Sequence, residues 1–522
     1  MNILGLNSNN ENSSAALIKD GSLCNFVQEE RFSRIKYDNS FPRRSIQYLL
    51  ENNQLERAEL DLSIGSFESR NKKTKYCIST RIGQRKILAW DGFHHQAHAA
   101  SAYRFSSFKK ANILVIDACG DNRDSITFFV GDGDRMHKIW DVKIDQISLG
   151  MIYKDATTKA GFGKNHEGKF MGLSSYGKAS RDYKDIFYIE SHQEIHNCYA
   201  EKIRKKAAKS NLYKMPARGV IDFSATIQKC LERSVINLIK EIHRLTKIGD
   251  FCFAGGIFLN SKLLGEIDRL HFINDIFVQP NAGDAGLAIG YAMEMTARFG
   301  NTKRFRFNVY SGPSFLDSAI WQAAKKFPVT IKRLSDPAGM AANLLERNCF
   351  IGWFQDGMEW GPRALGNRSI LANPSIKGNN IRLNNVKGRE LWRPFAPSIL
   401  EEHASDWVDL HRPSPYMTTC FFAKANMRKR GCAVVHVDGT TRVQTVSFSQ
   451  NSLYYSLIKN FYKKTGIPFV LNTSFNYQGE PIVCSPQEAI MDLIRMRIDA
   501  LIAGNYLITV TSWNACLKHM NK

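Results

Sequence analysis

The sequence predicts an α/β protein with two domains. Its 522 residues are too many for one ordinary hydrophobic core. Hydrophobic residues make up 43% of the chain and charged residues 23%, as in globular proteins. Two segments, FCFAGG running into LNSKLLGEI and IFVQP running into AGDAGLAIGYAMEM, each predict a strand, a glycine turn and a helix. Such units build a sheet whose turns suit phosphate groups.

The elements before these units also follow from local patterns. The first 30 residues predict a meander of three strands, NILGLN, SSAALIKDG and SLCNFVQEER, with Gly21 in a turn. Apolar residues at helical spacing predict a helix from Pro42 to Glu51. Ile113 to Asp117 and Ile126 to Val130 predict two strands that form a hairpin through a polar turn.

The chain changes character after Arg298, where GNTKRFRFNVYSGPSF lacks clear periodicity. We therefore place the domain boundary near residue 305, which gives an N-terminal domain of residues 1–305 and a C-terminal domain of residues 306–522. The second domain carries arginine-rich loops and β-rich stretches such as IPFVLN. The sequence itself contains no evident internal repeat.

Charge and cysteine content limit the classes of function. The formal net charge is +22, and two lysine-rich runs, Arg70 to Lys86 and Lys202 to Arg218, are typical of solvated loops or helix faces. A basic surface, attraction to nucleic acid or anionic membranes, and phosphate-bearing small substrates all remain open explanations. Eleven scattered cysteines without a CxxC pair fit neither a zinc ribbon nor a disulfide framework.

No run approaches the roughly 18 apolar residues that span a bilayer. The segment from Met1 to Leu17 has Asn and Glu where a signal peptide needs an apolar core. We expect a cytoplasmic protein that does not associate with membranes.

The strongest hint of chemistry is a pair of histidines in HHQAHAASA. His94 and His98 are four residues apart, so both can reach one metal ion from one helix face. Asp117, at the end of ILVID, and Asp284, in AGDAG, could complete a shell that suits iron, manganese or zinc better than magnesium. A purely structural histidine pair is the competing interpretation, and Asp284 could instead cap a helix.

The turn in AGGIFLN offers backbone N–H groups at a predicted helix start, where an anionic phosphate is favoured. Its candidate residues are Gly255, Gly256 and Asn260. A tight structural turn would explain the glycines equally well.

Cationic side chains gather in loops of the second domain. Guanidinium groups match phosphate oxygens in pairs, so the set favours a polyphosphate site over separate surface salt bridges. The residues are Arg363 and Arg368 in GMEWGPRALGNRSIL, Lys387, Arg389 and Arg393 in VKGRELWRPFAPS, and Arg442 in DGTTRVQT. In NTSFNYQGEPI, Asn472, Ser474 and Asn476 could orient a nucleotide or simply end a strand through Asx turns.

Taken together, these segments resemble the O-carbamoyltransferases. The matching segments keep their order through nearly the whole chain: EERFSRIKYD, HHQAHAASA, HEGKFMGLSSYGK, AGGIFLN, QPNAGDAG, EWGPRALGNRSI, RPFAPS, HVDGTTRVQTV and NTSFNYQGEPI. The resemblance implies an N-terminal domain of the actin-like ATPase type, similar to TsaD, and a C-terminal YrdC-like α/β domain.

The resemblance also implies an activity. The C-terminal domain would combine carbamoyl phosphate with ATP, bound with Mg²⁺, into carbamoyladenylate, and the N-terminal domain would transfer the carbamoyl group to a hydroxyl of a sugar or natural product. It assigns metal ligation, with iron(II) as the expected ion, to His94, His98, Asp117 and Asp284. Lys36 is the candidate contact to the carbamoyl end, and Lys169, Gly255, Gly256 and Asn260 are candidates for binding the adenylate. The cationic and polar residues of the C-terminal loops would bind ATP and carbamoyl phosphate.

This chain departs from the family pattern near the predicted acceptor. The family commonly has His-Asp before the small-residue run SSAAL, whereas this chain has Glu11 and Asn12. A glutamate can act as general base if its surroundings raise its pKa, so we predict Glu11 in that role. An acceptor that needs no base, or a changed reaction, remains open. Tyr37 also stands where His is frequent.

Two other functions remain open. A tRNA-modifying enzyme of the threonylcarbamoyl type would explain the net charge of +22, and a non-enzymatic nucleotide-binding regulator could share the actin-like domain. Nucleic acid is a partner only in the first of these. The sequence does not identify the acceptor or the oligomeric state.

Overall fold

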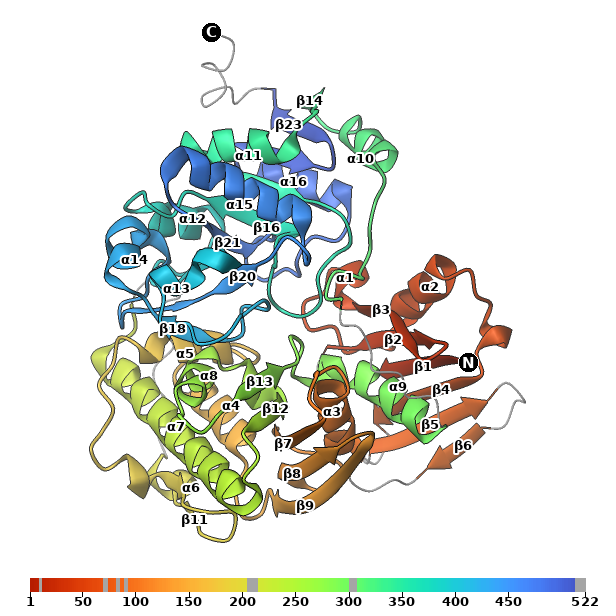
Figure 1. Cartoon of the computed structure of the whole chain (residues 1–522), viewed down its shortest axis with the longest axis vertical. Coiled ribbons are helices and arrows are strands. Elements are labelled where there is room, and N and C mark those ends of the chain that lie inside the picture. Colours follow the sequence, from red (N-terminus) through yellow and green to blue (C-terminus); the bar gives the residue numbers. More distant parts are fainter. Residues whose placement is uncertain are drawn as a thin grey trace. The chain divides into compact units, whose positions relative to one another are not determined.

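The computed structural model describes residues 1–8, 12–68, 74–80, 85–88, 93–203, 215–299 and 308–511. It contains two compact α/β units, and the α/β class predicted from the sequence is confirmed (Figure 1). The first unit holds the described residues up to Asn308 except Met215, and the second holds Met215 and the described residues from Val309 onward.

The first unit contains two large sheets that share the arrangement of four strands. In one sheet, the antiparallel meander β3-β2-β1 is followed by β4, which is parallel to β1, and by β5 and β6. These strands are β1 (Asn2–Asn7), β2 (Ser14–Lys19), β3 (Ser22–Gln28), β4 (Leu62–Glu68), β5 (Thr74–Thr80) and β6 (Arg85–Leu88). The three-strand meander predicted for the first 30 residues is therefore confirmed.

In the other sheet, the meander β9-β8-β7 is followed by β12, parallel to β7, and by β13 (Figure 1). These strands are β7 (Lys110–Ile116), β8 (Asp124–Asp132), β9 (Arg135–Lys143), β12 (Asp250–Ala254) and β13 (Asp275–Val278). A meander with a parallel strand beside its first strand thus occurs twice, as expected for the duplicated actin-like domain that the sequence resemblance implies.

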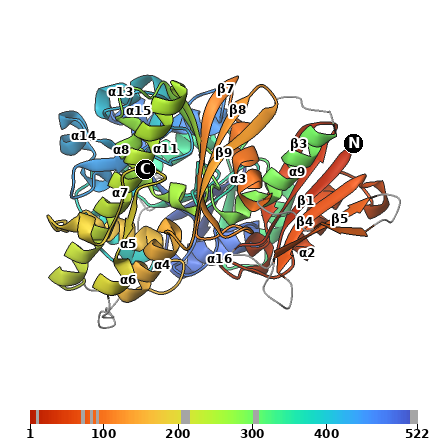
Figure 2. The same cartoon turned by 90° about the horizontal axis from the view of Figure 1, so that it is seen from below.

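Two helices fill the space between these sheets. Helix α9 (Leu287–Arg298) packs on β1 and β2, α3 (Phe93–Tyr103) packs on β7 and β12, and the two helices pack on each other (Figure 2). Because both are covered from opposite sides, nearly every residue of α3 and α9 is buried. At their crossing, a Cβ atom on Gly290 would lie 2.0 Å from the Ala97 carbonyl oxygen, so only glycine allows this approach.

The remaining elements of the first unit are mostly helices. The longest, α7, is amphipathic and buries one face against α4, α5 and α8. The remaining helices of the first unit are α1 (Glu30–Ser33), α2 (Arg43–Asn52), α4 (Leu149–Lys159), α5 (Glu167–Ser174), α6 (Tyr199–Lys202), α7 (Arg218–Thr246) and α8 (Ser261–Asp268). A hairpin pairs β10 (Phe187–Ile189) with β11 (Ile195–Asn197).

The first lysine-rich run forms strands, so the expectation of a loop or helix face is wrong there. Strands β5 and β6 lie within or reach the run from Arg70 to Lys86. TKYCIST is rich in the aromatic and β-branched residues Tyr76, Ile78, Thr74 and Thr80, which favour strands, and the charges around it concealed this signal. Residues 204–214 of the second run lie outside the described residues.

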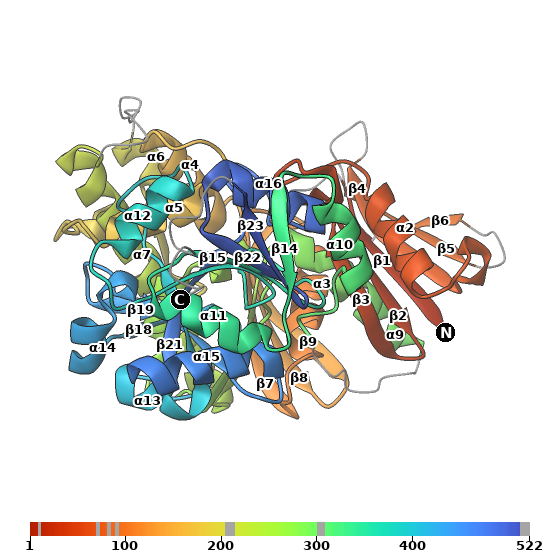
Figure 3. The same ribbon diagram turned by 90° about the horizontal axis from the view of Figure 1, so that it is seen from above.

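The second unit is built on a mixed sheet of eight strands in the order β14-β23-β22-β15-β16-β21-β17-β20 (Figure 3). The strands are β14 (Val329–Arg333), β15 (Ile351–Phe354), β16 (Arg368–Ala372), β17 (Ala396–Leu400), β20 (Gln444–Val446), β21 (Phe469–Ser474), β22 (Ala500–Ala503) and β23 (Tyr506–Val510). A small hairpin pairs β18 (Cys420–Phe422) with β19 (Thr440–Arg442).

Helices cover this sheet and enclose one large apolar core. Helices α11 and α15 pack together against β15, β17 and β21, and α10 and α16 pack together against β14, β15, β22 and β23. The helices are α10 (Asp317–Ala324), α11 (Pro337–Glu346), α12 (Asn379–Val386), α13 (Ala404–Trp407), α14 (Ala425–Arg430), α15 (Ser452–Thr465) and α16 (Pro486–Met496). Within the described ranges, every helix is either too short or too polar to cross a lipid bilayer.

Candidate functional site

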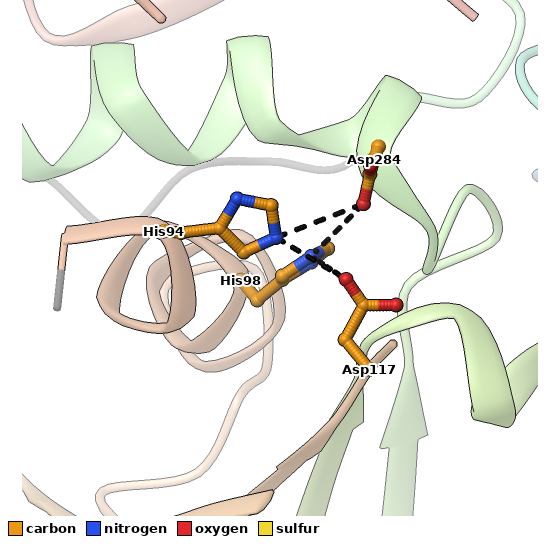
Figure 4. A group of neighbouring side chains, drawn as sticks. All are labelled: His94, His98, Asp117 and Asp284. Atoms are coloured by element: carbon orange, nitrogen blue, oxygen red, sulfur yellow. Dashed lines mark hydrogen bonds and ion pairs between the residues drawn. The ribbon is translucent and has the colours of Figure 1, made fainter. Parts of the chain in front are cut away.

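Four side chains of the first unit converge into a group that could hold a metal ion (Figure 4). One potential ligand atom from each of His94, His98, Asp117 and Asp284 lies within 4.8 Å of the other three. Nε2 of His94 lies 3.2 Å from Asp117 Oδ2 and 3.7 Å from Asp284 Oδ1. Nε2 of His98 lies 3.6 Å from each of the same two oxygens. The structure thus brings together the four residues selected from the sequence.

Local structure explains this convergence. His94 and His98 are one turn apart on α3, and Asp117 is the first residue after β7. Asp284 begins a short 3-10 helix, η4 (Asp284–Gly286), which leads into α9. Because α3 and α9 pack on each other, the turn before α9 lies beside the start of α3.

The glycine turn after β12 fixes the carboxylate of Asp117. Gly255 has a φ of 97°, and a Cβ there would lie 2.2 Å from the Ile116 carbonyl oxygen. Only glycine fits this left-handed, crowded position. The next residue, Gly256, donates its N–H to Asp117 Oδ1 at 3.2 Å. One carboxylate oxygen of Asp117 therefore accepts a hydrogen bond from the glycine turn, and the other faces the two histidines.

The polar atoms of this group fit a divalent cation. Both ring nitrogens of His98 are buried without a hydrogen-bond partner among the described residues, and its Nε2 faces two carboxylates just beyond hydrogen-bond distance. A cation between these groups would satisfy the orphaned nitrogen and both carboxylates. Two imidazoles and two carboxylates form the donor set of several first-row transition metals.

The ionisable side chains of this group shift one another's pKa values. Burial alone would lower the pKa of the His94 imidazole, but its hydrogen bond to Asp117 and the charges of Asp284 and Asp121 raise it to about 9. Burial also opposes protonation of His98, yet Asp117 and Asp284 raise its pKa. Burial would raise the pKa of Asp117, but the two imidazoles hold it well below its usual range. Positive charge is thus strongly favoured between the carboxylates.

The first sheet meets the metal group through Ser14. The Ser14 hydroxyl donates to the carbonyl oxygen of Ala285, which follows Asp284, at 2.7 Å. Its neighbour Ser13 donates its N–H to the Asp38 carbonyl oxygen at 2.7 Å. Glu11, the predicted base, lies outside the described residues. Ser13 and Ser14, which follow Glu11 closely in the chain, therefore contact the RIKYD segment and the Asp284 turn, respectively.

The RIKYD segment is tied to the loop before α5. Tyr37 has a φ of 59°, donates its N–H to Glu30 Oε2 at 2.9 Å, and donates its hydroxyl to the Asn165 carbonyl oxygen at 3.2 Å. Lys36 is exposed and places its Nζ 5.5 Å from the centre of the Tyr37 ring. Lys169 is buried on α5, four residues after Asn165. These contacts bring two predicted binding segments to one region of the first unit.

Asn260 has a structural role in the first unit. Its Oδ1 caps α8 by accepting the Leu263 N–H at 3.0 Å, and its Nδ2 donates to Gln228 Oε1 at 2.9 Å. Gln228 in turn accepts the Tyr153 hydroxyl at 2.7 Å. These bonds engage the amide of Asn260, so its predicted contact with the adenylate stays a prediction.

Three predicted arginines come together in the second unit. Burial lowers the pKa of the Arg389 guanidinium, and the charges of Arg393 and Arg442 lower it further, against the opposing charge of Glu390. Nη2 of Arg389 and Nε of Arg442 are buried without a hydrogen-bond partner among the described residues. Nη1 of Arg393 also lies 3.7 Å from Oε2 of Glu390. The positive charges of these three arginines therefore act on one another in one buried cluster.

Lys387, Ser474 and Asn476 form a second group. The buried ammonium of Lys387 donates to the carbonyl oxygen of Ser474, and to the backbone and side-chain oxygens of Asn476 at 2.9 and 3.2 Å. The Ser474 hydroxyl donates to Asn476 Oδ1 at 2.6 Å. These hydrogen bonds join the VKGRE and NTSFN segments. They also use much of the hydrogen-bonding capacity of the Lys387 ammonium group.

Arg368 does not present its guanidinium as the sequence suggested. It is fully buried, donates to the carbonyl oxygens of Gln355, Asn367, Pro313 and Asp356, and lies 3.8 Å above the ring of Phe354. We therefore leave Arg368 out of the proposed phosphate contacts. The pattern of polar and apolar residues in the sequence could not reveal that Arg368 is buried.

Asn472 also serves the loop that contains Arg363. Its Nδ2 donates to the Ala364 carbonyl oxygen at 3.0 Å, and Gln444 Nε2 donates to the Leu365 carbonyl oxygen at 2.7 Å. Arg363 itself is half-buried in this loop. The sequence analysis missed Gln444, although its place two residues after Arg442 was a signal.

Glu359 is a further residue that the sequence analysis missed. One carboxylate oxygen, Oε1, accepts the backbone N–H groups of Leu365, Asn367 and Arg368 at 2.6, 3.3 and 3.2 Å. A carboxylate inside the glycine-rich segment EWGPRALGNR was the available signal, although its burial is visible only in the structure. Glu359 shapes the loop of Arg363 without being a phosphate ligand.

Comparison with known proteins follows the same division of the chain. The family model "Carbamoyltransferase N-terminus" matches residues 2–80 and 71–293, and "Carbamoyltransferase C-terminus" matches residues 342–510. Nodulation protein NolNO of Sinorhizobium fredii (strain NBRC 101917 / NGR234) is 35% identical over 535 residues, which cover 95% of this chain and 78% of that protein. Nodulation protein NolO of Bradyrhizobium diazoefficiens is 35% identical over 449 residues, covering 81% and 80%.

Among solved structures, T. kodakarensis HypF matches 58% of this chain and 48% of its own with 12% identity and a TM-score of 0.36. That likeness is too loose to add to the strand order described above. The two family models and the sequence identity over most of the chain are sufficient to assign the family. The chain belongs to the carbamoyltransferase family and is a carbamoyltransferase enzyme.

Proposed function

We propose that this enzyme is an ATP-dependent O-carbamoyltransferase with two sites. The C-terminal YrdC-like unit makes carbamoyladenylate from carbamoyl phosphate and ATP. The N-terminal unit transfers the carbamoyl group to a hydroxyl of a small molecule, a sugar or natural product. The observation that carries this proposal is that each compact unit contains its own charged site: the arginine cluster in one and the His–Asp group in the other.

The first reaction has a definite balance. Water releases phosphate from carbamoyl phosphate to leave carbamate, and a carbamate oxygen attacks the α-phosphorus of ATP with release of pyrophosphate. Adenylation gives the carbamoyl carbon a good leaving group, AMP. Both substrates and both leaving groups are anionic, so the site must offset negative charge throughout.

The cluster of Arg389, Arg393 and Arg442 is suited to that task. Its mutual repulsion is relieved when polyphosphate oxygens enter, and guanidinium groups bind such oxygens in pairs. Arg363 adds a fourth cation from the loop held by Glu359. The group of Lys387, Ser474 and Asn476 contributes a cation already fixed in place.

The second reaction joins the acceptor oxygen to the carbamoyl carbon and breaks the bond to AMP, while the acceptor proton passes to a base. A divalent metal held by His94, His98, Asp117 and Asp284 would supply a Lewis acid for the adenylate phosphate. Glu11 is the proposed base, and Ser13 and Ser14 anchor the chain after it beside Asp38 and Ala285. Lys36 is proposed to contact the carbamoyl end.

We propose iron(II) as the resident metal and Mg²⁺ as the ion that accompanies ATP. The mixed nitrogen and oxygen donors favour a first-row transition metal over Mg²⁺, which prefers oxygen ligands. Manganese(II) is the most practical substitute for experiments in air.

The adenylation step can be tested without knowing the acceptor. Purified protein is incubated with ATP, carbamoyl phosphate, Mg²⁺ and iron(II) or manganese(II), and pyrophosphate is measured. We expect pyrophosphate release that depends on carbamoyl phosphate. Absence of pyrophosphate with every metal tried would rule out the two-step scheme.

Matched variants separate the two sites. Arg442→Ala should abolish pyrophosphate release, whereas Arg347→Ala, which removes an exposed arginine at the end of α11, should not. His98→Ala should still release pyrophosphate but should lose AMP formation with a panel of hydroxylated acceptors. If His98→Ala transfers as well as the wild type, the metal group has no part in transfer.

A further inference from the structure

The hairpin turn that supplies Asp117 also supplies a second carboxylate, Asp121. Both residues lie between the end of β7 at Ile116 and the start of β8 at Asp124. Asp117 Oδ2 lies 3.2 Å from Nε2 of His94, and Asp121 Oδ1 lies 4.0 Å from Nδ1 of the same ring. The side chains of His94 and Asp121 are 5% and 6% exposed, so water screens this pair poorly. One turn thus approaches both nitrogens of one imidazole.

Asp121 also holds the start of the helix that carries both histidines. Its Oδ2 accepts the backbone N–H of His94 at 2.8 Å. The first N–H groups of a helix have no partner within the helix, and a carboxylate there satisfies a donor and interacts favourably with the helix dipole. Asp121 therefore fixes the backbone of His94 with one oxygen and faces its side chain with the other.

We infer that Asp121 is a positioning residue for the metal ligand His94. Its negative charge beside Nδ1 favours keeping a proton on that nitrogen, so that a metal between Asp117 and Asp284 would replace the proton on Nε2 and not the one on Nδ1. Its bond to the His94 N–H keeps that ring at the first turn of α3. This inference rests on the proposed metal site.

The experiment measures metal affinity directly. Apo-protein is titrated with manganese(II), and free manganese(II) is followed by electron paramagnetic resonance. Loss of such an outer carboxylate typically weakens metal binding by about 10–100-fold, so Asp121→Ala should fall in that range. Asp121→Asn keeps an acceptor for the His94 N–H but loses the charge, so it should bind more weakly than the wild type and more tightly than Asp121→Ala.

The matched control is Asp336→Ala. Asp336 caps α11 by accepting the Gly339 N–H at 2.8 Å, which is the same capping chemistry in the second unit, and none of the four proposed ligands lies on α11. Asp336→Ala should bind manganese(II) like the wild type. Thermal unfolding of each apo-protein separates a loss of helix stability from a loss of metal affinity.

His98→Ala distinguishes the two ways of failing. If the wild type binds manganese(II), His98→Ala does not, and both Asp121 variants bind like the wild type, the role of Asp121 is wrong and the metal site stands. If His98→Ala binds as well as the wild type, the metal site is wrong and the inference fails with it.

Discussion

Gly290 and Ala97 are in direct backbone contact where α9 crosses α3. A Cβ atom on Gly290 would lie 2.0 Å from the carbonyl oxygen of Ala97 and 2.6 Å from its carbonyl carbon. Ala97 lies between the two candidate metal-binding histidines, and α9 follows the turn that carries Asp284. The separation of these helices therefore sets the distance between ligands that are remote in the sequence.

Gly290→Ala should force the helices apart. Overpacking of this kind typically costs about 1–3 kcal/mol of unfolding free energy, which denaturant unfolding can measure. Gly219→Ala is the control, because a Cβ at Gly219 meets nothing within 4 Å. We also expect weaker manganese(II) binding by Gly290→Ala. A variant as stable as the wild type would show that the crossing adjusts freely.

Arg442→Met should make the ligand-free enzyme more stable while it removes pyrophosphate release. The variant relieves the repulsion among Arg389, Arg393 and Arg442, and stability gained by relaxing a charged site is typically about 0.5–2 kcal/mol. Thermal unfolding without substrates checks the gain. A less stable, inactive variant would instead identify Arg442 as a structural residue.

Glu359→Ala should make the loop that contains Arg363 less ordered. The carboxylate accepts three backbone N–H groups, and each buried donor left without a partner costs about 1–3 kcal/mol. We expect a large loss of stability and greater protease sensitivity between residues 359 and 368. Glu359→Gln keeps an acceptor oxygen and should recover most of the stability. Equal effects of both variants would point to the charge rather than to the hydrogen bonds.

Asp38→Asn should change how stability depends on pH in the acid range. Burial alone would raise the pKa of Asp38, but hydrogen bonds from Ser33 and Ser40 and the charge of Arg44 lower it. A lowered pKa in the folded state stabilises the protein above the unfolded value of about 3.9, and that stabilisation is lost as the pH falls through the folded pKa.

The variant should therefore be less stable than the wild type at neutral pH, and the difference should shrink below about pH 4. Denaturant unfolding at several pH values measures it. Asp134→Asn, which changes an exposed aspartate on a turn, serves as control. A difference that stays constant with pH would show that the Asp38 charge does not stabilise the fold.

The elements that carry the metal group could be predicted because their determinants are local. The spacing of His94 and His98 requires only a helix, and Asp117 follows a continuous apolar run. That Asp284 joins them depends on the packing of α9 against α3, which no local pattern reveals. The family resemblance supplied that pairing.

Features that depend on burial or on distant pairing could not be predicted. The two sheets of the first unit share the arrangement of four strands without a visible sequence repeat, because a strand needs only an apolar pattern and not particular residues. Arg368 reads as a loop cation in the sequence, yet four backbone carbonyl oxygens and the ring of Phe354 surround it. The strand β5 was hidden by Lys75 and by the two lysines that precede it in the sequence.

The order of the ligands along the chain makes the metal group a late product of protein synthesis. Asp284 follows Asp117 by 167 residues. At about 5–20 residues per second, the last ligand leaves the ribosome on the order of 10–30 s after the third. During that interval a nascent chain can present two imidazoles and one carboxylate with one side open. Metal loading at full affinity therefore has to wait until α9 docks against α3.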